Sequence, residues 1–423
     1  MQHRQQNGER LSVAIIGAGI VGCSAALTLA KEGHRVTVFS DEEPGAGTSY
    51  GNAGAIVTGS ITPTATPAVV RSLPSYMFNR NSPAVLRLHH TAKALPWIKR
   101  FIAAGTTAAV DRIAAAMHPL VSRALIAHQE LAAIAAATDM ITQEGWLKVY
   151  ESEQDFQSSA LERRLMTRHG VCHEILSQSS LLDLEPALSP SACYKGLYQP
   201  RAGNVRFPKK LAQIYLEAAQ TFGATFVRDH ISSVEPLEQG GVALHSLSGE
   251  RRYDRIVIAT GAWSTLFTKQ LGDRISLESE RGYHISFGAG SQSLLRGPIV
   301  IPGQGFVLSP MHDGLRLISG DELAGLKAPP NYKRIRALLP KAMMLIPALK
   351  GWSPTSEWMG QRPSTPDTLP VIGRAHRSRD VIYAFGHGHL GVTLSAITAQ
   401  LVADLVGERT PAINITPYSP TRF

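Results

Sequence analysis

Three glycines near the start of the chain have the spacing of a phosphate-binding turn. Gly17, Gly19 and Gly22 follow the β-branched run LSVAII and open the helix-forming run CSAALTLAKEG. Gly17 permits a tight turn, Gly19 lets the backbone approach a diphosphate, and Gly22 lets the helix pack closely on the strand. The helix N-terminus adds free N–H groups and a partial positive charge. This spacing predicts a nucleotide-binding turn.

The elements around this turn decide between three interpretations of the uncharged stretch 13–30. By length and hydropathy the stretch could be a signal peptide or a membrane-spanning helix. However, a strand before the glycines, a helix that stops at Gly33 and a second β-rich run at 34–39 together form a strand–turn–helix–strand unit. We therefore predict a dinucleotide-binding fold and no membrane-spanning segment.

An acidic residue at the end of the second strand would bind the ribose of the nucleotide. Ser40 directly follows the strand, and Asp41, Glu42 and Glu43 come after it. Asp41 is the first candidate, and Glu42 is the alternative if the register differs by one residue. No arginine follows immediately, which disfavours a 2′-phosphate and therefore NADP. The loop 44–56, rich in Gly, Ser, Thr and Asn, favours a long flavin cofactor over NAD.

A second group of candidate residues lies near the C-terminus. The proline-punctuated segment 359–374 predicts a loop carrying one arginine before its end, Arg362, whose planar guanidinium suits a carboxylate; a surface ion pair is the alternative. The segment 380–406 then predicts a strand, a glycine-rich turn and a long helix. Its N-terminus near Gly391–Thr393 would stabilise negative charge on a reduced flavin ring. His387 and His389 in the turn could tune that charge or shuttle protons, or simply pack there.

The remaining chain predicts the elements that must position these residues. Alanine-rich segments between 103 and 140 predict packed helices, and 144–152 predicts a strand. A helix ending at Gly223 is followed by a strand, and RIVIAT predicts a buried strand that breaks at Gly261. Two further segments alternate like antiparallel strands, with a hairpin turn at 312–314.

Composition limits the classes of protein that remain. A chain of 423 residues, 44% hydrophobic and 18% charged, can bury a large core in two or more domains. Three distant cysteines without a CxxC pair disfavour a disulfide framework and a zinc site, so no metal is expected, Cys23 is interpreted as packed, and a reducing compartment fits best. The net charge of +9 is scattered, without a contiguous Lys/Arg run, which disfavours nucleic acid. The densest basic stretch, 86–101, predicts a solvated helix face, with contact to anionic lipid as the alternative.

The segments GAGIVG, GTSYGNAG, ATGAWS, GQRPSTPDTLPVIGR and GHGHLGVT resemble the D-amino-acid dehydrogenase branch of the FAD-dependent D-amino-acid oxidase family, over about residues 11–411. The resemblance implies an α/β fold: a discontinuous Rossmann-like FAD-binding domain at 10–70, 195–272 and 355–415, and an α+β substrate-binding domain with an antiparallel sheet at 71–194 and 273–354. Ser40 departs from the family pattern, where many relatives have an acid. His389 replaces a smaller residue.

The same resemblance implies roles for individual residues. Arg362 would pair with the substrate carboxylate, and Tyr283 and His389 would lie in the substrate pocket, with simple core packing as the alternative for Tyr283. Val227 would lie by the adenine and Gly261 beneath the cofactor. The residues expected to contact FAD are Gly17, Gly19, Gly22, Asp41 or Glu42, Ser49, Asn52, Ala53, Gly54, Val227, Gly261, Gly386, Gly388, His389, Leu390, Gly391 and Thr393.

The reaction that the resemblance implies is oxidation of a D-amino acid, or of a cyclic D-imino acid such as D-proline or hydroxy-D-proline, by hydride transfer from Cα to flavin N5. The imine would then hydrolyse. Alignment contributes most to such a step, so no nucleophile is required. Electrons would pass to a respiratory quinone, or to another acceptor that is not oxygen, in a cytoplasmic enzyme, with peripheral contact to the inner face of the cytoplasmic membrane as an option. The alternatives are a peroxide-forming flavin oxidase of the glycine, sarcosine or opine type, a tRNA-modifying flavoprotein, and a non-catalytic nucleotide-binding module.

Overall fold

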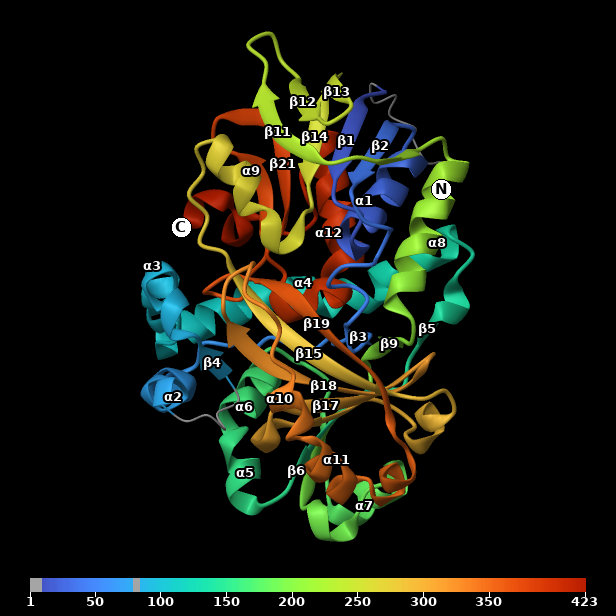
Figure 1. The fold of residues 1–423 in the computed structure, drawn as a ribbon, viewed down its shortest axis with the longest axis vertical. Coiled ribbons are helices and arrows are strands. Elements are labelled where there is room, and N and C mark those ends of the chain that lie inside the picture. Colours follow the sequence, from blue (N-terminus) through green and yellow to red (C-terminus); the bar gives the residue numbers. More distant parts are fainter. Residues whose placement is uncertain (1–9, 79–83) are drawn as a thin grey trace.

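The computed structural model describes residues 10–78 and 84–423, and most of its strands lie in two large sheets (Figure 1). The first is six-stranded, and its strands come from widely separated parts of the chain. Neighbours pair in parallel except at the β20 edge; for example, Ile16 lies between Phe39 and Ile258. The strands, in spatial order, are β10 (Thr225–Arg228), β2 (Arg35–Ser40), β1 (Ser12–Ile16), β14 (Arg255–Ile258), β21 (Ser378–Phe385) and β20 (Val371–Ala375). The predicted dinucleotide-binding fold and the buried strand RIVIAT are confirmed.

Long helices cover this sheet and contribute most of the main core. The central helix α1 packs against α8 and α12, and α12 also packs against α4. Their bounds are α1 (Ile20–Lys31), α4 (Thr107–Ile134), α8 (Pro208–Thr221) and α12 (Gly391–Val406). By length and hydropathy 388–406 could cross a membrane, but 78% of it is buried inside the protein. It is therefore the core helix of this layer, and 13–30 is β1, the glycine turn and most of α1.

The second large sheet has nine strands and lies in the other half of the molecule (Figure 1). It is antiparallel apart from two parallel pairs, β16 with β6 and β4 with β18. The predicted hairpin at 312–314 joins β17 to β18 and is confirmed. In spatial order the strands are β19 (Pro354–Ser364), β15 (Glu278–Phe287), β18 (Gly314–Leu323), β17 (Phe306–Met311), β16 (Ile299–Ile301), β6 (Trp146–Tyr150), β8 (Lys195–Gln199) and β7 (Glu174–Leu176), with β4 (Ala84–Leu86) beside β18.

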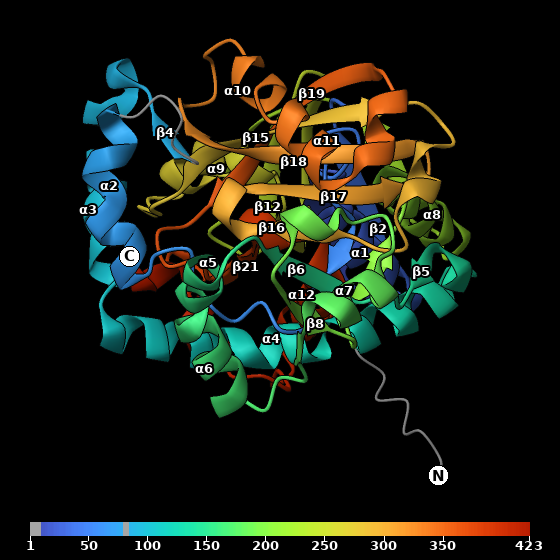
Figure 2. The same ribbon diagram turned by 90° about the horizontal axis from the view of Figure 1, so that it is seen from below.

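The two faces of the nine-stranded sheet have different neighbours. Helices α10 (Lys333–Arg336) and α11 (Leu339–Leu345) lie over one face (Figure 2), where Tyr283, Ile285 and Leu317 join a second core. Residues on the other face of the same strands border the cavity described below. Successive residues of a strand face opposite sides of the sheet, so the Tyr283 side chain faces the second core whereas its neighbour Gly282 faces the cavity.

The prediction of a loop at 359–374 is wrong for its first part. Residues 359–364 belong to β19, in which Arg362 pairs with Glu280 and Pro363 with Ser279 of β15. Proline is tolerated here because β19 is an edge strand, where a missing N–H donor costs no ladder hydrogen bond. Arg362 is therefore fixed by sheet register.

The small elements complete the fold. Two three-stranded sheets are formed by β3 (Ala55–Ile56), β9 (Gly203–Val205) and β5 (Ile141–Thr142), and by β11 (Ile231–Pro236), β12 (Val242–Ser246) and β13 (Gly249–Tyr253). Shorter helices are α2 (Pro67–Phe78), α5 (Glu153–Ser158), α6 (Ala160–Arg168), α7 (Gln178–Leu184) and α9 (Thr265–Gln270). β8 and β19 are both strands of the nine-stranded sheet, although the domain boundaries predicted at 195 and 355 assign them to the FAD-binding domain. The division into domains stays a prediction.

The basic stretch 86–101 lies mostly in α3 (Leu88–Ala104). Trp97 and Phe101 are buried with their rings stacked at 5.0 Å, and the Trp97 indole donates to the Ser364 carbonyl at 2.9 Å. Lys99 and Arg100 are exposed. The helix thus has a buried aromatic face and an exposed basic face, and the choice between a solvated face and lipid contact stays a prediction. The three cysteines are free, and burial raises the pKa of the Cys23 thiol to about 12.

Candidate active site

A cavity of about 950 Å³ lies between the two large sheets. On one side it is bordered by residues at the carboxyl ends of β1, β2, β14 and β21, where ligands of open parallel sheets bind. On the other side it is bordered by residues of β6, β15, β16, β17, β18 and β19. Its volume is at the upper end of the range for ligand pockets.

The β1–α1 turn contains glycines that are needed for two different reasons. Gly17 has φ +107°, and a Cβ there would lie 2.5 Å from the Ala259 carbonyl oxygen. A Cβ at Gly22 would lie 1.9 Å from the Gly17 oxygen, so both positions are fixed by packing. A Cβ at Gly19 would meet only the Ser49 hydroxyl, at 3.6 Å. The space over Gly19 is thus open on the side where a diphosphate is predicted.

Two helix N-termini border the same cavity. The first turns of α1 and α12 contain no acidic residue, so their partial positive charges are available to an anion. Thr393 in the first turn of α12 is held by the segment at β3: its hydroxyl donates to the Ala55 carbonyl at 2.9 Å and accepts from the Val57 N–H at 3.2 Å. A long cavity with one such terminus at each glycine-rich turn fits FAD.

The acidic end of the cavity contains both candidates for the ribose ligand. Asp41 and Glu42 border it, and the Asp41 carboxylate lies 3.3 Å from Nδ1 of His230. Asp229, His230 and Ser232 were missed by the sequence analysis. They follow β10, which pairs in parallel with β2, so the two strand ends meet at one edge.

The structure brings most of the predicted cofactor residues together around the cavity: Gly17, Gly19, Asp41, Glu42, Ser49, Asn52, Ala53, Gly261, Gly388, His389, Leu390, Gly391 and Thr393. Within the part of the chain that the structure describes, Gly22, Gly54, Val227 and Gly386 are not among the lining residues. A Cβ at Gly54 would lie 2.1 Å from the Val205 oxygen, and one at Gly386 would lie 3.0 Å from the Thr365 side chain. Gly54 thus makes room for a neighbouring backbone and Gly386 for neighbouring side chains, while the FAD contacts of each residue stay predictions.

The loop between β2 and β3 is held by the opposite sheet. Arg316 of β18, only 2% exposed, donates to the carbonyl oxygens of Tyr50 at 2.9 Å and Asn52 at 3.2 Å. The Ser309 hydroxyl donates to the Ala53 carbonyl at 2.8 Å. Burial and the nearby Arg316 lower the pKa of His284 to about 3, so this ring stays neutral next to the guanidinium. The loop geometry at the cavity thus depends on the nine-stranded sheet.

The floor of the cavity alternates between bare backbone and large side chains. Gly282 of β15 pairs in register with Gly360 of β19, and a Cβ at Gly282 would lie 2.2 Å from Nη2 of Arg362. The Trp358 ring lies against Gly360 and Gly51. Further along the sheet the wall becomes apolar, with the side chains of Trp146, Val300, Val307 and Ile318, and ends at a Lys148–Glu162 ion pair of 2.6 Å.

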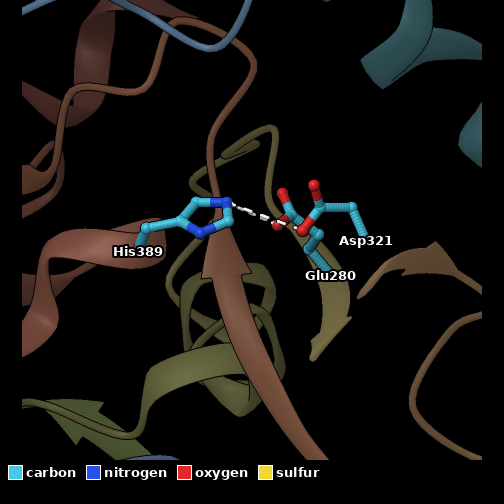
Figure 3. A group of neighbouring side chains, drawn as sticks. All are labelled: Glu280, Asp321 and His389. Atoms are coloured by element: carbon cyan, nitrogen blue, oxygen red, sulfur yellow. Dashed lines mark ion pairs between the residues drawn. The ribbon is translucent and has the colours of Figure 1, made fainter. Parts of the chain in front are cut away.

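Arg362 lies at the polar end of this floor in a network of charged side chains. Its Nη1 donates to the Gly320 carbonyl at 2.8 Å, to Asp321 Oδ1 at 2.8 Å and to Glu280 Oε1 at 3.2 Å. His389 Nε2 forms an ion pair with the same Glu280 oxygen at 2.6 Å and lies 4.0 Å from Asp321 (Figure 3). Glu280 and Asp321 were missed by the sequence analysis; the available signal was carboxylates in otherwise buried strands, where unpaired charge is costly.

The charges in this network shift one another's titration. Burial opposes ionisation of Glu280, but His389 and Arg362 outweigh burial and hold the Glu280 pKa well below its usual range. Burial lowers the pKa of His389, but Glu280 more than compensates and the net shift is upward. Partial burial and the neighbouring Glu280 raise the pKa of Asp321 to about 6. Three potential metal ligands lie within 4.8 Å here, but the Arg362 guanidinium already supplies the cation, so we interpret the group as an ion-pair network.

Two other candidate side chains have different surroundings. Tyr283 borders the cavity, but its ring packs into the second core and its hydroxyl donates to Glu322 at 2.5 Å. Its side chain is thus committed elsewhere, and a substrate contact through it stays a prediction. His387 lies 3.0 Å from the Thr398 hydroxyl, and burial lowers its pKa to about 4. Of the two histidines in the turn, His389 is the one paired with a carboxylate.

Comparisons with known proteins agree with this geometry. A family model described as FAD dependent oxidoreductase (DAO) matches residues 12–405. A D-amino-acid oxidase of Bradyrhizobium diazoefficiens is 36% identical over 417 residues, covering 97% of this chain and 98% of that protein. A D-amino acid dehydrogenase of Sinorhizobium medicae is 29% identical over 431 residues, covering 98% of this chain and 100% of that protein. The crystal structure of glycine oxidase from Geobacillus kaustophilus is similar with a TM-score of 0.77 and 24% identity, covering 98% of this chain and 99% of that one, which shows the shared fold.

Proposed function

The chain belongs to the DAO family of FAD-dependent oxidoreductases, and from this premise we propose that it oxidises the Cα–N bond of D-amino acids or cyclic D-imino acids. It is an FAD-dependent enzyme, and amino acid oxidation is the activity that its relatives' names share. The preference for the D configuration is taken from the same relatives.

One observation supports this proposal most directly. A single cavity is bordered by the two glycine-rich turns and by the one arginine that the sequence singles out, Arg362. The turns suit the anionic cofactor, and the guanidinium suits the carboxylate of an amino acid. A non-catalytic nucleotide-binding module would leave that arginine at the cavity without a purpose.

The chain's own residues would hold the substrate for the reaction. FAD, when bound, supplies the two-electron acceptor. Arg362 would bind the substrate carboxylate, and the register of β19 with β15 fixes the guanidinium over Gly282. The apolar wall of Trp146, Val300 and Val307 would accept the side chain and exclude water. Alignment of Cα is the main contribution expected from the protein.

The electron acceptor divides this proposal into two candidates. The first is a dehydrogenase that passes electrons to a respiratory quinone, as the D-amino acid dehydrogenase relatives suggest by name. The second is a peroxide-forming oxidase, which is favoured by the name of the relative that is 36% identical. The dehydrogenase candidate includes a cytoplasmic location with peripheral contact to the membrane, for which the exposed Lys99 and Arg100 on α3 are suitable.

The test is anaerobic reduction of the bound flavin by single amino acids. We expect D-alanine, D-proline or a larger apolar D-amino acid to bleach the flavin absorbance, whereas their L-enantiomers leave it unchanged. Failure of every D- and L-amino acid and of glycine to bleach it would overturn the proposal. Reoxidation of the bleached enzyme by oxygen or by a quinone analogue then separates the candidates: rapid peroxide formation would establish the oxidase.

A further inference from the structure

Glu280 is a buried carboxylate that contacts both charged groups at the polar end of the cavity. Its Oε1 receives Arg362 Nη1 at 3.2 Å and His389 Nε2 at 2.6 Å, and its Oε2 accepts the Ser364 hydroxyl at 2.9 Å. The residue is 7% exposed. A guanidinium and an imidazole from different elements, β19 and the turn before α12, are thus held side by side by the buried Glu280, and Asp321 lies on the same two groups at 2.8 Å and 4.0 Å.

The proposed function uses the guanidinium but leaves the imidazole without a role. An amino acid enters as a zwitterion, whose ammonium group must lose a proton before Cα can be oxidised to an imine. A base that removes this proton must stand beside the group that holds the carboxylate, since the two substrate groups share one carbon. Among the side chains that border the cavity beside Arg362, the imidazole of His389 satisfies this requirement.

We propose that His389, held by Glu280, takes the proton from the ammonium group of the bound amino acid, and that Asp321 delivers it to solvent. This inference rests on the proposed function. In the first step an N–H bond of the ammonium breaks and an N–H bond forms at Nδ1, the ring nitrogen outside the ion pair with Glu280. In the second step the Nε2–H bond of the imidazolium breaks and the proton passes to Glu280 Oε1, 2.6 Å away, and from Glu280 to Asp321, with which it shares a side-chain hydrogen bond. No electrons are transferred in either step.

The charged groups around the imidazole favour its reversible protonation. The charged groups that face it are Glu280 on β15, Asp321 on β18 and Arg362 on β19. Glu280 stabilises the imidazolium, whereas Arg362 opposes it and keeps the proton removable. Asp321 differs from Glu280 in its exposure: its side chain is 41% exposed and does not border the cavity, so it connects the pair with water outside.

The test measures the anaerobic rate of flavin reduction by a D-amino acid between pH 6 and 10. In the unaltered enzyme the rate should rise through the titration of His389. In His389→Gln we expect a fall of about 100-fold at pH 8, the size of a lost general base. The remaining rate should rise only with the substrate's own ammonium, so the two proteins converge near pH 10. The substrate dissociation constant should change little, because Arg362 is retained.

Companion variants separate this role from a merely structural one. Asp321→Asn should slow reduction less than His389→Gln, and Glu280→Gln should both slow reduction and weaken substrate binding. His90→Gln is the matched control. His90 pairs at 2.9 Å with Glu278, which lies on β15 like Glu280, but His90 does not border the cavity. Its pH profile should match that of the unaltered enzyme. Flavin content and circular dichroism check that each variant is folded and loaded.

A second readout does not depend on turnover. The pKa of His389 can be measured by NMR titration of ¹⁵N-histidine-labelled protein, with the signal assigned by its loss in His389→Gln. We expect this pKa to lie above that of an ordinary histidine and to fall in Glu280→Gln. Two results would overturn the inference. One is a His389→Gln enzyme whose rate of flavin reduction has the same pH dependence as the unaltered enzyme and lies within threefold of its rate. The other is a His389 imidazole that stays neutral down to pH 6. If amino acids bleach the unaltered enzyme, either outcome leaves the proposed function standing. If none bleaches it, both fall.

Discussion

The two ends of the cavity are built in different ways. At the β1–α1 turn, the backbone groups that would face the cofactor diphosphate come from one continuous stretch, 16–22, whose shape follows from three glycines; a side chain added there from another segment, Ser49, accepts the Ile20 N–H at 3.0 Å. At the polar end, four side chains meet that are far apart in the chain: Glu280, Asp321, Arg362 and His389. Strand register and one turn bring them together.

This difference separates recognition of the cofactor from selection of the substrate. The turn uses backbone N–H groups and a helix terminus, which depend on conformation and not on particular side chains. The polar end uses ionisable side chains whose effect depends on each other's charge. Substitutions at the turn should therefore act on all functions together, whereas substitutions at the polar end should separate binding, proton transfer and stability.

The largest effect is expected at Gly22. In Gly22→Val the new Cβ would lie 1.9 Å from the Gly17 oxygen, and the helix cannot move away because α1 is packed between α8 and α12. We expect loss of bound flavin and a fall in folding stability of about 4 kcal/mol or more, as for severe overpacking with backbone strain. Flavin content and the thermal midpoint measure both. Gly351→Ala is the control, since no atom lies within 4 Å of its added Cβ; a flavin-loaded Gly22→Val would contradict the role of the turn.

The second effect is the removal of Arg362. Arg362→Ala deletes the expected partner of the substrate carboxylate. It also removes one of the two cations that balance the buried negative charge of Glu280. We expect the substrate dissociation constant to rise roughly 100-fold, or about 3 kcal/mol, with flavin content unchanged. Arg362→Lys should recover only part of the loss, because an ammonium cannot form the two parallel hydrogen bonds of a guanidinium. Titration of the flavin absorbance with a carboxylate ligand measures binding apart from turnover, and unchanged affinity would remove Arg362 from the site.

A moderate effect is expected at Arg316, which connects the two regions. Arg316→Met keeps the bulk of the side chain but removes the donors to the Tyr50 and Asn52 carbonyls. The unpaired carbonyls and the looser loop should weaken FAD binding by about tenfold, or 1–2 kcal/mol. Equilibrium dialysis of the apoprotein with FAD measures this loss. Arg336→Met is the matched control, since Arg336 forms an exposed ion pair with Glu357 on the outer side and should change FAD affinity by less than about twofold.

The contrast between the regions also explains what could be predicted from the sequence. The turn, the following strand, RIVIAT and the second strand–turn–helix unit were predicted correctly because their signals are local: β-branched runs, helix formers and glycines in order. The position of Arg362 on a strand was not, because three prolines within the segment 359–374 outweigh its strand-forming residues when the edge position of β19 is unknown. The glycine-rich turn that contains His389 was predicted from the sequence, but Glu280, the carboxylate that pairs with His389, was not.

Glu280 and Asp321 could not be found in the same way. Pairing of Glu280 with Arg362 depends on the register of β15 with β19, across 82 positions of sequence. A bulge in the β15–β18 pairing, between Arg281 and Tyr283, also shifts which residues of β18 lie beside the arginine. Neither register follows from alternation within one strand, because alternation gives the face of a residue and not its neighbour. The charged residues in SLESERGYHIS show only that some partner must exist.

The smallest effect tests whether the polar end is built for function at the expense of stability. The pKa of Asp321 is raised to about 6, so its ionised form is disfavoured in the folded protein relative to the unfolded chain. Ionisation therefore destabilises the fold above pH 6, and this penalty disappears below about pH 4, where the carboxyl is protonated in both states. Glu280 acts in the opposite direction: its lowered pKa contributes stability that is lost as the pH falls.

Asp321→Asn removes the penalty while keeping an oxygen that accepts from Arg362. Two pKa units would correspond to almost 3 kcal/mol, but the side chain is 41% exposed and water screens its charge, so we expect a gain of about 1 kcal/mol at pH 8. This corresponds to a rise of roughly 1–2 °C in the thermal midpoint for a chain of this size. The gain should vanish at pH 4, and the exposed Asp139→Asn should give none at either pH. A variant that is less stable at pH 8 would show that the Asp321–Arg362 ion pair outweighs the repulsion by Glu280, and the polar end would then resemble the turn in being optimised for stability.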